Sequence, residues 1–156
     1  MKQQISISEF EPVLTMTDYY DGPRGGIALF HGKPHLYESK FLDFERNAEG
    51  EYLEEDHYYL TLIDDTVLQL ALEDWEIWLR WEAAFHAGLT DTSTHPALPP
   101  DRSRHEILKP LLSSALLTKK DDAIVAKAEF RAIPNSRPEG CFLKLEVAWT
   151  TISRIT

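Results

Sequence analysis

The densest group of aromatic side chains in this chain lies in residues 74–88. Trp75, Trp78 and Trp81 are three residues apart, which places them on about two turns of a predicted helix, and Phe85 follows four residues later. A buried aromatic ring removes roughly 150–250 Å² from water, and apolar burial is worth about 25 cal/mol per Å². A segment with this much aromatic surface must therefore hold the centre of a core or wall a pocket.

Two helices are predicted in the middle of the chain. Asp74 is predicted to cap the first, because its carboxylate can accept from the amides of the first turn, and Gly88 to end it in a left-handed conformation. Residues 101–117 carry apolar side chains at helical spacing, with Pro110 inside the stripe, so this second helix is expected to kink or divide. Residues 89–100, with three prolines, are expected to form an irregular crossing.

Strands are predicted on both sides of these helices. Apolar and polar residues alternate over 124–132 and 141–149, the pattern of a half-buried antiparallel pair. Upstream, Gly32-Lys33 predicts a hairpin turn, and residues 66–73 fit either a strand or a helix. The other strand-like segments lie between turn formers and are 12–20, 26–31, 34–44 and 57–63, with an exposed loop expected at 45–56.

These elements predict an α+β fold in one domain over residues 1–156. We expect a curved antiparallel sheet of about six strands, four N-terminal and two C-terminal, with the two helices between them covering one side. The single cysteine, Cys141, excludes an intramolecular disulfide and is predicted to be a small buried residue at a strand start. No stretch has the length of a signal peptide core or approaches the roughly 18 apolar residues of a membrane span. We therefore expect a soluble, cytoplasmic protein that does not enter membranes.

The charge balance restricts the class of partner. The chain has 26 acidic and 16 basic residues, a formal net charge of −10, and its Lys119-Lys120 pair is followed directly by two aspartates. Such a surface repels nucleic acid, so we expect no direct nucleic-acid binding. The same acidity favours a basic protein partner.

A first candidate site is the segment from Asp18 to Gly26. Asp18, Tyr20, Asp21 and Arg24 combine carboxylates, a phenol and a guanidinium at a strand end, beside glycines that allow close approach to the backbone. In a functional reading the arginine clamps a carboxylate or phosphate while an aspartate or tyrosine acts as acid or base. In the structural reading, which we favour, the second aspartate caps the turn, the arginine pairs with an aspartate and the tyrosines pack. The glycines form no GxGxxG motif, so a nucleotide site is not predicted.

Two further candidates lie in or near the predicted helices. His86, His95 and His105 surround the proline-rich crossing, but their spacing matches no zinc-ligand pattern, so no metal is predicted. Arg80 lies between Trp78 and Trp81. It either forms a solvated helix pair with a glutamate four residues earlier, which we favour, or stacks on a tryptophan to recognise a flat or anionic ligand.

Three segments carry a resemblance to a group of small bacterial proteins. YYDGPRGGIALFHGKPHLYE, LEDWEIWLRWEAAFHAG and THPALPPDRSRHEIL follow one another over roughly residues 16–117. The chain resembles proteins in which a YDGPRxGIA segment precedes a WxIWxRWxxAF segment. This resemblance implies a bacterial, cytoplasmic protein. It brings no activity, cofactor or catalytic residue, but it draws attention to residues 18–24 and to the aromatic helix.

Two functional hypotheses from different classes follow. The first is a non-catalytic binding or protein-interaction domain, because aromatic and arginine side chains are the anchors of such surfaces. The alternative is a small hydrolase- or lyase-like enzyme whose groups meet in a cleft walled by tryptophans: Asp18, Asp21, Arg24, His86 or His105, Trp78 and Trp81. A third possibility is a homodimer paired through a C-terminal strand at residues 142–155. No cofactor is predicted, and the protein or small molecule bound is left open.

Overall fold

The computed structural model describes residues 9–40, 56–117, 123–138 and 143–152. The chain forms two compact units. The sheet unit comprises residues 1–62, 118–132 and 145–156, and the helical unit comprises residues 63–117 and 133–144. The α+β class, with a curled antiparallel sheet and two helices among the described residues, is confirmed. The single-domain organisation and the covering of one side of the sheet by the helices stay predictions.

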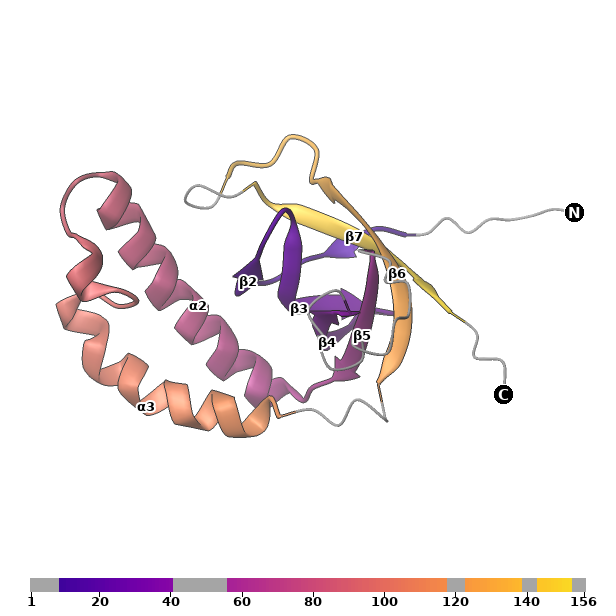
Figure 1. The fold of residues 1–156 in the computed structure, drawn as a ribbon, viewed down its shortest axis with the longest axis horizontal. Coiled ribbons are helices and arrows are strands. Elements are labelled where there is room, and N and C mark those ends of the chain that lie inside the picture. The colour runs from indigo at the N-terminus through magenta and orange to yellow at the C-terminus, as the bar shows by residue number, and fades with distance from the viewer. Residues whose placement is uncertain (1–8, 41–55, 118–122, 139–142, 153–156) are drawn as a thin grey trace, which may run out of the picture. The chain divides into compact units, whose positions relative to one another are not determined.

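Within the described ranges, the sheet unit has seven antiparallel strands in the order β1-β7-β6-β5-β4-β3-β2 (Figure 1). Their bounds are β1 Glu11–Pro12, β2 Asp18–Tyr19, β3 Pro23–Phe30, β4 Lys33–Ser39, β5 His57–Leu62, β6 Ile124–Ala132 and β7 Leu145–Thr151. The described residues contain seven strands where about six were expected, because the segment predicted as one strand at 12–20 contributes to two short strands with different partners. The predicted C-terminal antiparallel pair is confirmed as β6 and β7, although β7 covers 145–151 where the alternation predicted 141–149. Cys141 and most of the loop at 45–56 lie outside the described residues.

The segment between β1 and β2 joins the two sides of the curled sheet. Next to the β1–β7 pair, the amide of Val13 donates to the carbonyl of Leu145 at 3.0 Å, and Val13 also forms an isolated bridge with Ala28 in β3. The amides of Leu14 and Thr15 then both donate to the carbonyl of Ile27, at 2.8 and 3.1 Å. One short segment therefore satisfies backbone groups of β7 and of β3, and the sheet closes through it.

Closure depends on a glycine in β3. Gly26 has φ +153°, and a Cβ atom at this position would lie 2.2 Å from the carbonyl oxygen of Thr15. The Thr15 hydroxyl also accepts a hydrogen bond from the amide of Ile27 at 2.9 Å. Only glycine combines this φ with so close a backbone approach, so Gly26 permits the crossing that the sequence patterns did not reveal.

The β3–β4 hairpin turns at His31 and Gly32, one residue earlier than the predicted Gly32-Lys33. Both residues have positive φ, +54° and +75°, as in the mirror-image turns that suit the twist of a two-residue hairpin. Their amides converge on the carboxylate of Glu11, at 2.9 and 2.7 Å. This carboxylate ties β1 to the hairpin tip and strengthens closure of the sheet.

Aromatic side chains fill the inside of the sheet unit. Tyr37, Tyr58, Phe130 and Trp149 pack with ring centroids 5.6–6.1 Å apart in tilted and edge-on arrangements. Their polar atoms also have partners: Tyr37 donates to the carbonyl of Thr15 at 2.9 Å and Trp149 donates to the carbonyl of Leu29 at 3.2 Å. The core therefore combines apolar burial with one hydrogen bond to the segment that closes the sheet and one to β3.

The helical unit contains α2 Asp65–His86, η2 Thr92–Thr94 and α3 Pro99–Ala115. Residues 66–73 are helical. The N-cap is Asp64, whose carboxylate accepts from the amide of Val67 at 2.9 Å, so the prediction of Asp74 as N-cap was wrong. The reason is that the helix continues upstream through residues 66–73, whose sequence fits a strand as well as a helix. The predicted end at Gly88 is confirmed: φ is +76°, and the amide of Leu89 donates to the carbonyl of Ala84, as in a Schellman motif.

α3 continues through Pro110 as one helix, so of the two expected outcomes the division does not occur, and the kink stays a prediction. Pro110 is exposed, and on the solvent side of a helix a carbonyl without a helical donor can face water. The two helices pack through a small core of buried Ile77, Ala97 and Leu108, with Leu70 and Leu112 beside it. Only part of the apolar stripe of α3 takes part in this core.

Burial raises the pKa of the Tyr37 phenol well above its ordinary value of 10.0, with smaller contributions from Tyr58 and Asp18. The folded chain holds the phenol proton more tightly than the unfolded chain does, because the pKa is higher in the folded chain. The contribution of the protonated phenol to stability is therefore complete below pH 10 and is lost as pH rises through the folded pKa. We predict that, above about pH 10, the free energy of unfolding of wild type falls more steeply than that of Tyr37→Phe, by up to roughly 1.4 kcal/mol per pH unit. Urea titrations from pH 8 to 11 measure this. Parallel curves for the two proteins would contradict it.

Candidate functional site

The turn between β2 and β3 is held from inside by Arg24. This side chain is 4% exposed, and its Nε donates to the carbonyl of Tyr20 at 2.7 Å and Nη2 to that of Asp21 at 3.4 Å. Asp21 has φ +55°, a conformation that aspartate tolerates better than most residues. Arg24 therefore stabilises this turn through main-chain carbonyls. The cap by Asp21 and the pairing of Arg24 with Asp18 or Asp21 stay predictions.

The tyrosines of this turn do not pack as the structural reading expected. Tyr19 is 51% and Tyr20 is 66% exposed, and both aspartates, Asp18 and Asp21, are exposed as well. Behind them, a Cβ atom at Gly25 would lie 3.1 Å from the Cβ of Asp18, so the glycine permits close packing of β2 on β3. The structure thus brings all four candidate residues of this segment to one turn of the sheet unit.

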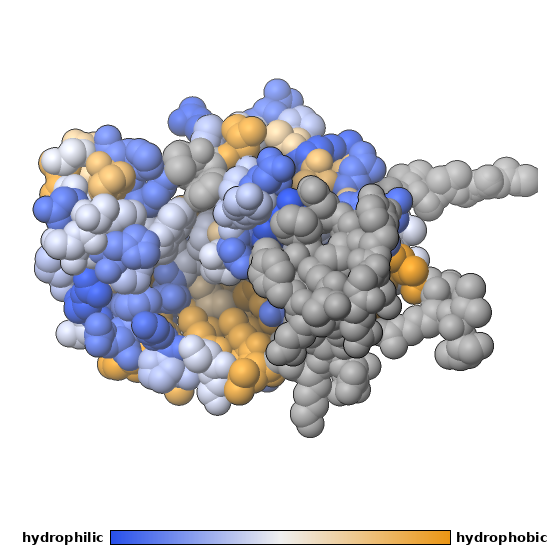
Figure 2. All heavy atoms as spheres, viewed as in Figure 1, coloured by the Kyte–Doolittle hydropathy of each residue, from blue (hydrophilic) through white to orange (hydrophobic). Residues whose placement is uncertain are grey.

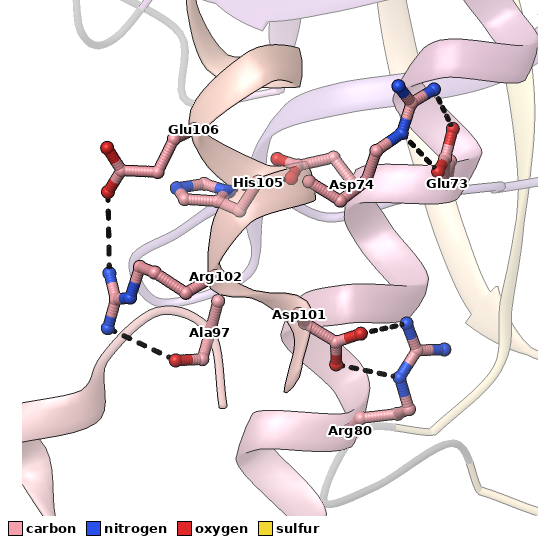
Figure 3. Close-up of polar contacts among 9 residues, drawn as sticks. Glu73, Asp74, Arg80, Ala97, Asp101, Arg102, His105 and Glu106 are labelled. Carbon is pink, nitrogen blue, oxygen red and sulfur yellow. Dashed lines mark hydrogen bonds and ion pairs between the residues drawn. The ribbon is translucent and has the colours of Figure 1, made fainter. Parts of the chain in front are cut away.

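The remaining candidates lie in the helical unit, where charged side chains join α2 to α3 (Figure 3). Arg80 donates to both carboxylate oxygens of Asp101, at 2.9 and 3.0 Å. Arg104 does the same to Glu73, at 2.6 and 2.8 Å. Two bidentate pairs, the strongest geometry for guanidinium and carboxylate, therefore hold the helices in register.

A contact between His105 and Asp74 also joins the two helices. His105 Nδ1 lies 2.7 Å from a carboxylate oxygen of Asp74, and the histidine side chain is only 12% exposed. Asp74, predicted as a helix cap, therefore serves as an interhelical partner in the middle of α2.

The two arginine pairs also change the pKa values of their carboxylates. Hydrogen bonds from Arg104 and Arg80 lower the pKa values of Glu73 and Asp101.

The tryptophans form two stacked pairs along α2. Trp75 stacks on Trp78 with centroids 5.1 Å apart, and Trp81 stacks on Phe85 at the same separation. Trp81 is 6% exposed, and its indole nitrogen donates to the Thr94 hydroxyl at 2.8 Å. Trp81 is therefore a buried anchor for the crossing between the helices.

The three histidines near the crossing each have a different neighbour. His86 Nε2 lies 3.2 Å from the buried carboxylate of Glu82. The rings of His95 and Trp81 meet edge-on with their centroids 4.7 Å apart. His105 pairs with Asp74 of α2. Within the described ranges, no group of three His, Cys, Asp or Glu side chains is arranged to hold a metal ion.

The candidate residues therefore fall into two groups. Asp18, Tyr20, Asp21 and Arg24 share a turn of the sheet unit, and Trp78, Arg80, Trp81, His86 and His105 belong to the helical unit. Sequence reasoning missed the partners Glu73, Asp101 and Arg104. A signal existed, because Glu73 and Arg80 are two turns apart on one helix while Asp101 and Arg104 are one turn apart with opposite charges on the next.

Comparison with protein-family models, curated proteins and solved structures finds no match. The resemblance to small bacterial proteins noted above therefore stays a prediction. In the described part of the chain, no helix is both long and apolar enough to cross a membrane.

The Arg80–Asp101 pair leads to a prediction about acid stability. The folded pKa of Asp101 lies below the unfolded value of 3.8, so its stabilising effect is present above pH 3.8 and is lost as pH falls through the folded pKa. We predict that Asp101→Asn is less stable than wild type at pH 7, by under about 1 kcal/mol because the arginine side is exposed to solvent. Urea titrations should show the stabilities of the two proteins converging as the pH falls below 3.8 and through the folded pKa of Asp101. An equal difference at pH 7 and pH 2 would contradict this account.

Proposed function

We propose that this protein is a non-catalytic, cytoplasmic protein-interaction domain, and that α3 presents a binding stripe for an amphipathic helix of a partner protein. The observation that supports this best is the exposure of large apolar side chains on α3. Ile107 is 53% exposed and Leu111 is 49% exposed, although they lie one turn apart on the same helix. We call these two side chains, with Pro110 between them, the α3 stripe.

The α3 stripe is the part of an apolar face that α2 leaves uncovered. On the same helix, Leu108 is fully buried and Leu112 packs beside it in the small interhelical core. Ile107 and Leu111 each precede one of these residues and so lie about 100° around the helix from them. The apolar face is wider than one partner helix buries, which is the pattern of a helix that accepts a second partner.

Figure 2 shows hydrophobic atoms among hydrophilic ones along the lower edge of the helical unit, where α3 runs in Figure 1. Leu117, just beyond the helix, is also exposed, at 81%.

The interhelical charge pairs suit this role. Two bidentate pairs and the His105 contact fix α3 against α2, so the stripe keeps its shape before a partner arrives. A rigid surface loses less conformational entropy on binding than a mobile one. In this proposal the charged candidates of the helical unit are therefore scaffold residues.

The hydrolase- or lyase-like alternative ranks second. It requires Arg24 and either His86 or His105 to act on a substrate. Arg24 donates to main-chain carbonyls, His86 lies 3.2 Å from the carboxylate of Glu82, and His105 is paired with Asp74. The homodimer alternative through the C-terminal strand is also weakened, because residues 145–147 of that strand already pair with the β1 segment.

Site-specific photo-crosslinking in living cells tests the proposal. A photoreactive phenylalanine derivative at Leu111 should give one dominant adduct with a second protein, because Leu111 lies in the stripe. The same group at Glu129, an exposed position of β6, is the matched control and should not give that adduct. Adding Ile107→Ser should remove the Leu111 adduct while the melting temperature changes little, since Ile107 is half exposed.

Three outcomes would contradict the proposal. The first is no adduct from Leu111, and the second is an identical adduct pattern from Leu111 and Glu129. The third is an adduct between two copies of this chain only, which would make α3 a dimer contact.

A further inference from the structure

We propose that the sheet unit carries a second binding surface, the tyrosine strip, which consists of residues 17–21 and takes an arginine-bearing segment of a partner protein. This surface belongs to a different unit from the α3 stripe and rests on different residues. It therefore goes beyond the proposed function and can be tested independently of it.

The first argument is the exposure of two neighbouring tyrosines. Tyr19 and Tyr20 are 51% and 66% exposed in a unit whose other described tyrosines, Tyr37, Tyr58 and Tyr59, are 0–3% exposed. Tyrosine is a preferred anchor of protein-binding surfaces, because it offers a large rigid area with a polar tip at a small entropy cost. Each of the two side chains therefore offers an exposed aromatic ring and a hydroxyl group to a partner.

The second argument is that the strip is fixed from beneath. The guanidinium of Arg24 holds the carbonyls of Tyr20 and Asp21, and the amide of Tyr20 donates to the carbonyl of Gly22 at 2.9 Å. The backbone is thus ordered while the side chains stay exposed. A surface ordered in advance binds without a large entropy penalty.

The third argument is charge complementarity. Asp18 and Asp21 are exposed at the two ends of the tyrosine pair, and residues 17–21 contain no basic side chain. The nearest cation in sequence is Arg24, which is 4% exposed and donates to main-chain carbonyls of the turn. The local surface therefore combines carboxylates with aromatic faces, in a chain with a net charge of −10.

Arginine fits this combination better than lysine. Its planar guanidinium can stack on a tyrosine face while two of its N–H groups bond to a carboxylate, whereas a lysine ammonium acts as a compact, strongly hydrated charge. Strand addition is the less suitable mode, because β2 has only two residues and its register shifts between Asp18 and Tyr19. A short, irregular edge is a poor template for backbone pairing, so recognition runs through side chains.

The test uses the full chain and two capped hexapeptides, one alternating arginine with threonine and one alternating lysine with threonine. Binding is measured by calorimetry and located by backbone amide shifts in NMR spectra at 150 mM salt. We expect the arginine peptide to bind several-fold more tightly than the lysine peptide, with the largest amide shifts in residues 17–21.

Matched variants distinguish binding by the carboxylates of the tyrosine strip from nonspecific attraction to the net negative charge of the protein. Asp18→Asn with Asp21→Asn removes two carboxylates, and Asn tolerates the left-handed conformation of residue 21. Glu76→Gln with Glu129→Gln changes the net charge equally at exposed positions elsewhere. We expect the first pair to weaken arginine-peptide binding about tenfold and the second by less than about twofold.

A second comparison tests the tyrosines at constant charge. Tyr20→Ser should weaken arginine-peptide binding by about fivefold. Leu62→Ser should leave it unchanged, because it removes another exposed apolar side chain, 59% exposed, from the same unit. Thermal melts confirm that each variant is folded.

Equal losses in the two charge pairs, equal affinity for arginine and lysine peptides, or amide shifts spread over the whole surface would overturn the inference and indicate only nonspecific attraction to an acidic protein. The Ile107→Ser variant should bind the peptide like wild type. Failure of the α3 stripe and failure of the tyrosine strip therefore give different results.

Discussion

The passage of Thr15 across Gly26 is the contact on which the sheet unit depends. At this point the main chain stops pairing with β7 and begins pairing with β3, and the Thr15 hydroxyl and carbonyl receive hydrogen bonds from Ile27 and Tyr37. The contact exists only because residue 26 has no Cβ atom. It links closure of the sheet to the buried aromatic core and determines where the chain leaves for β2.

The same crossing positions the tyrosine strip, because β2 begins three residues after Thr15 and is held to β3 by Gly25 and Arg24. In the helical unit, charged side chains hold the elements together, because bidentate arginine pairs fix α3 on α2. In both units, polar side chains with internal partners support exposed apolar or aromatic ones. This distribution is expected of a binding scaffold and is the physical basis of both proposals.

Sequence periodicity was sufficient for the α+β class, the β6–β7 pair and the end of α2, because each depends on local pattern or on one glycine. It was insufficient for the start of α2, where 66–73 satisfies two patterns and the true cap is Asp64. It also missed the break between β1 and β2, since a long-range contact between Thr15 and Gly26 interrupts a locally continuous strand. For the candidate sites, residue types were visible in sequence, but their interhelical partners depended on the register of α2 against α3.

Replacement of Gly26 by alanine, compared with Gly22→Ala, tests the central contact most directly. Gly22 also has a positive φ, +119°, but an added Cβ there meets nothing within 4 Å, so this variant isolates backbone strain from the clash with Thr15. The account predicts that Gly26→Ala lowers the free energy of unfolding by at least about 2 kcal/mol more than Gly22→Ala, and that the amides of Leu14 and Thr15 lose protection from hydrogen exchange. Equal costs for the two variants, with those amides still protected, would contradict it.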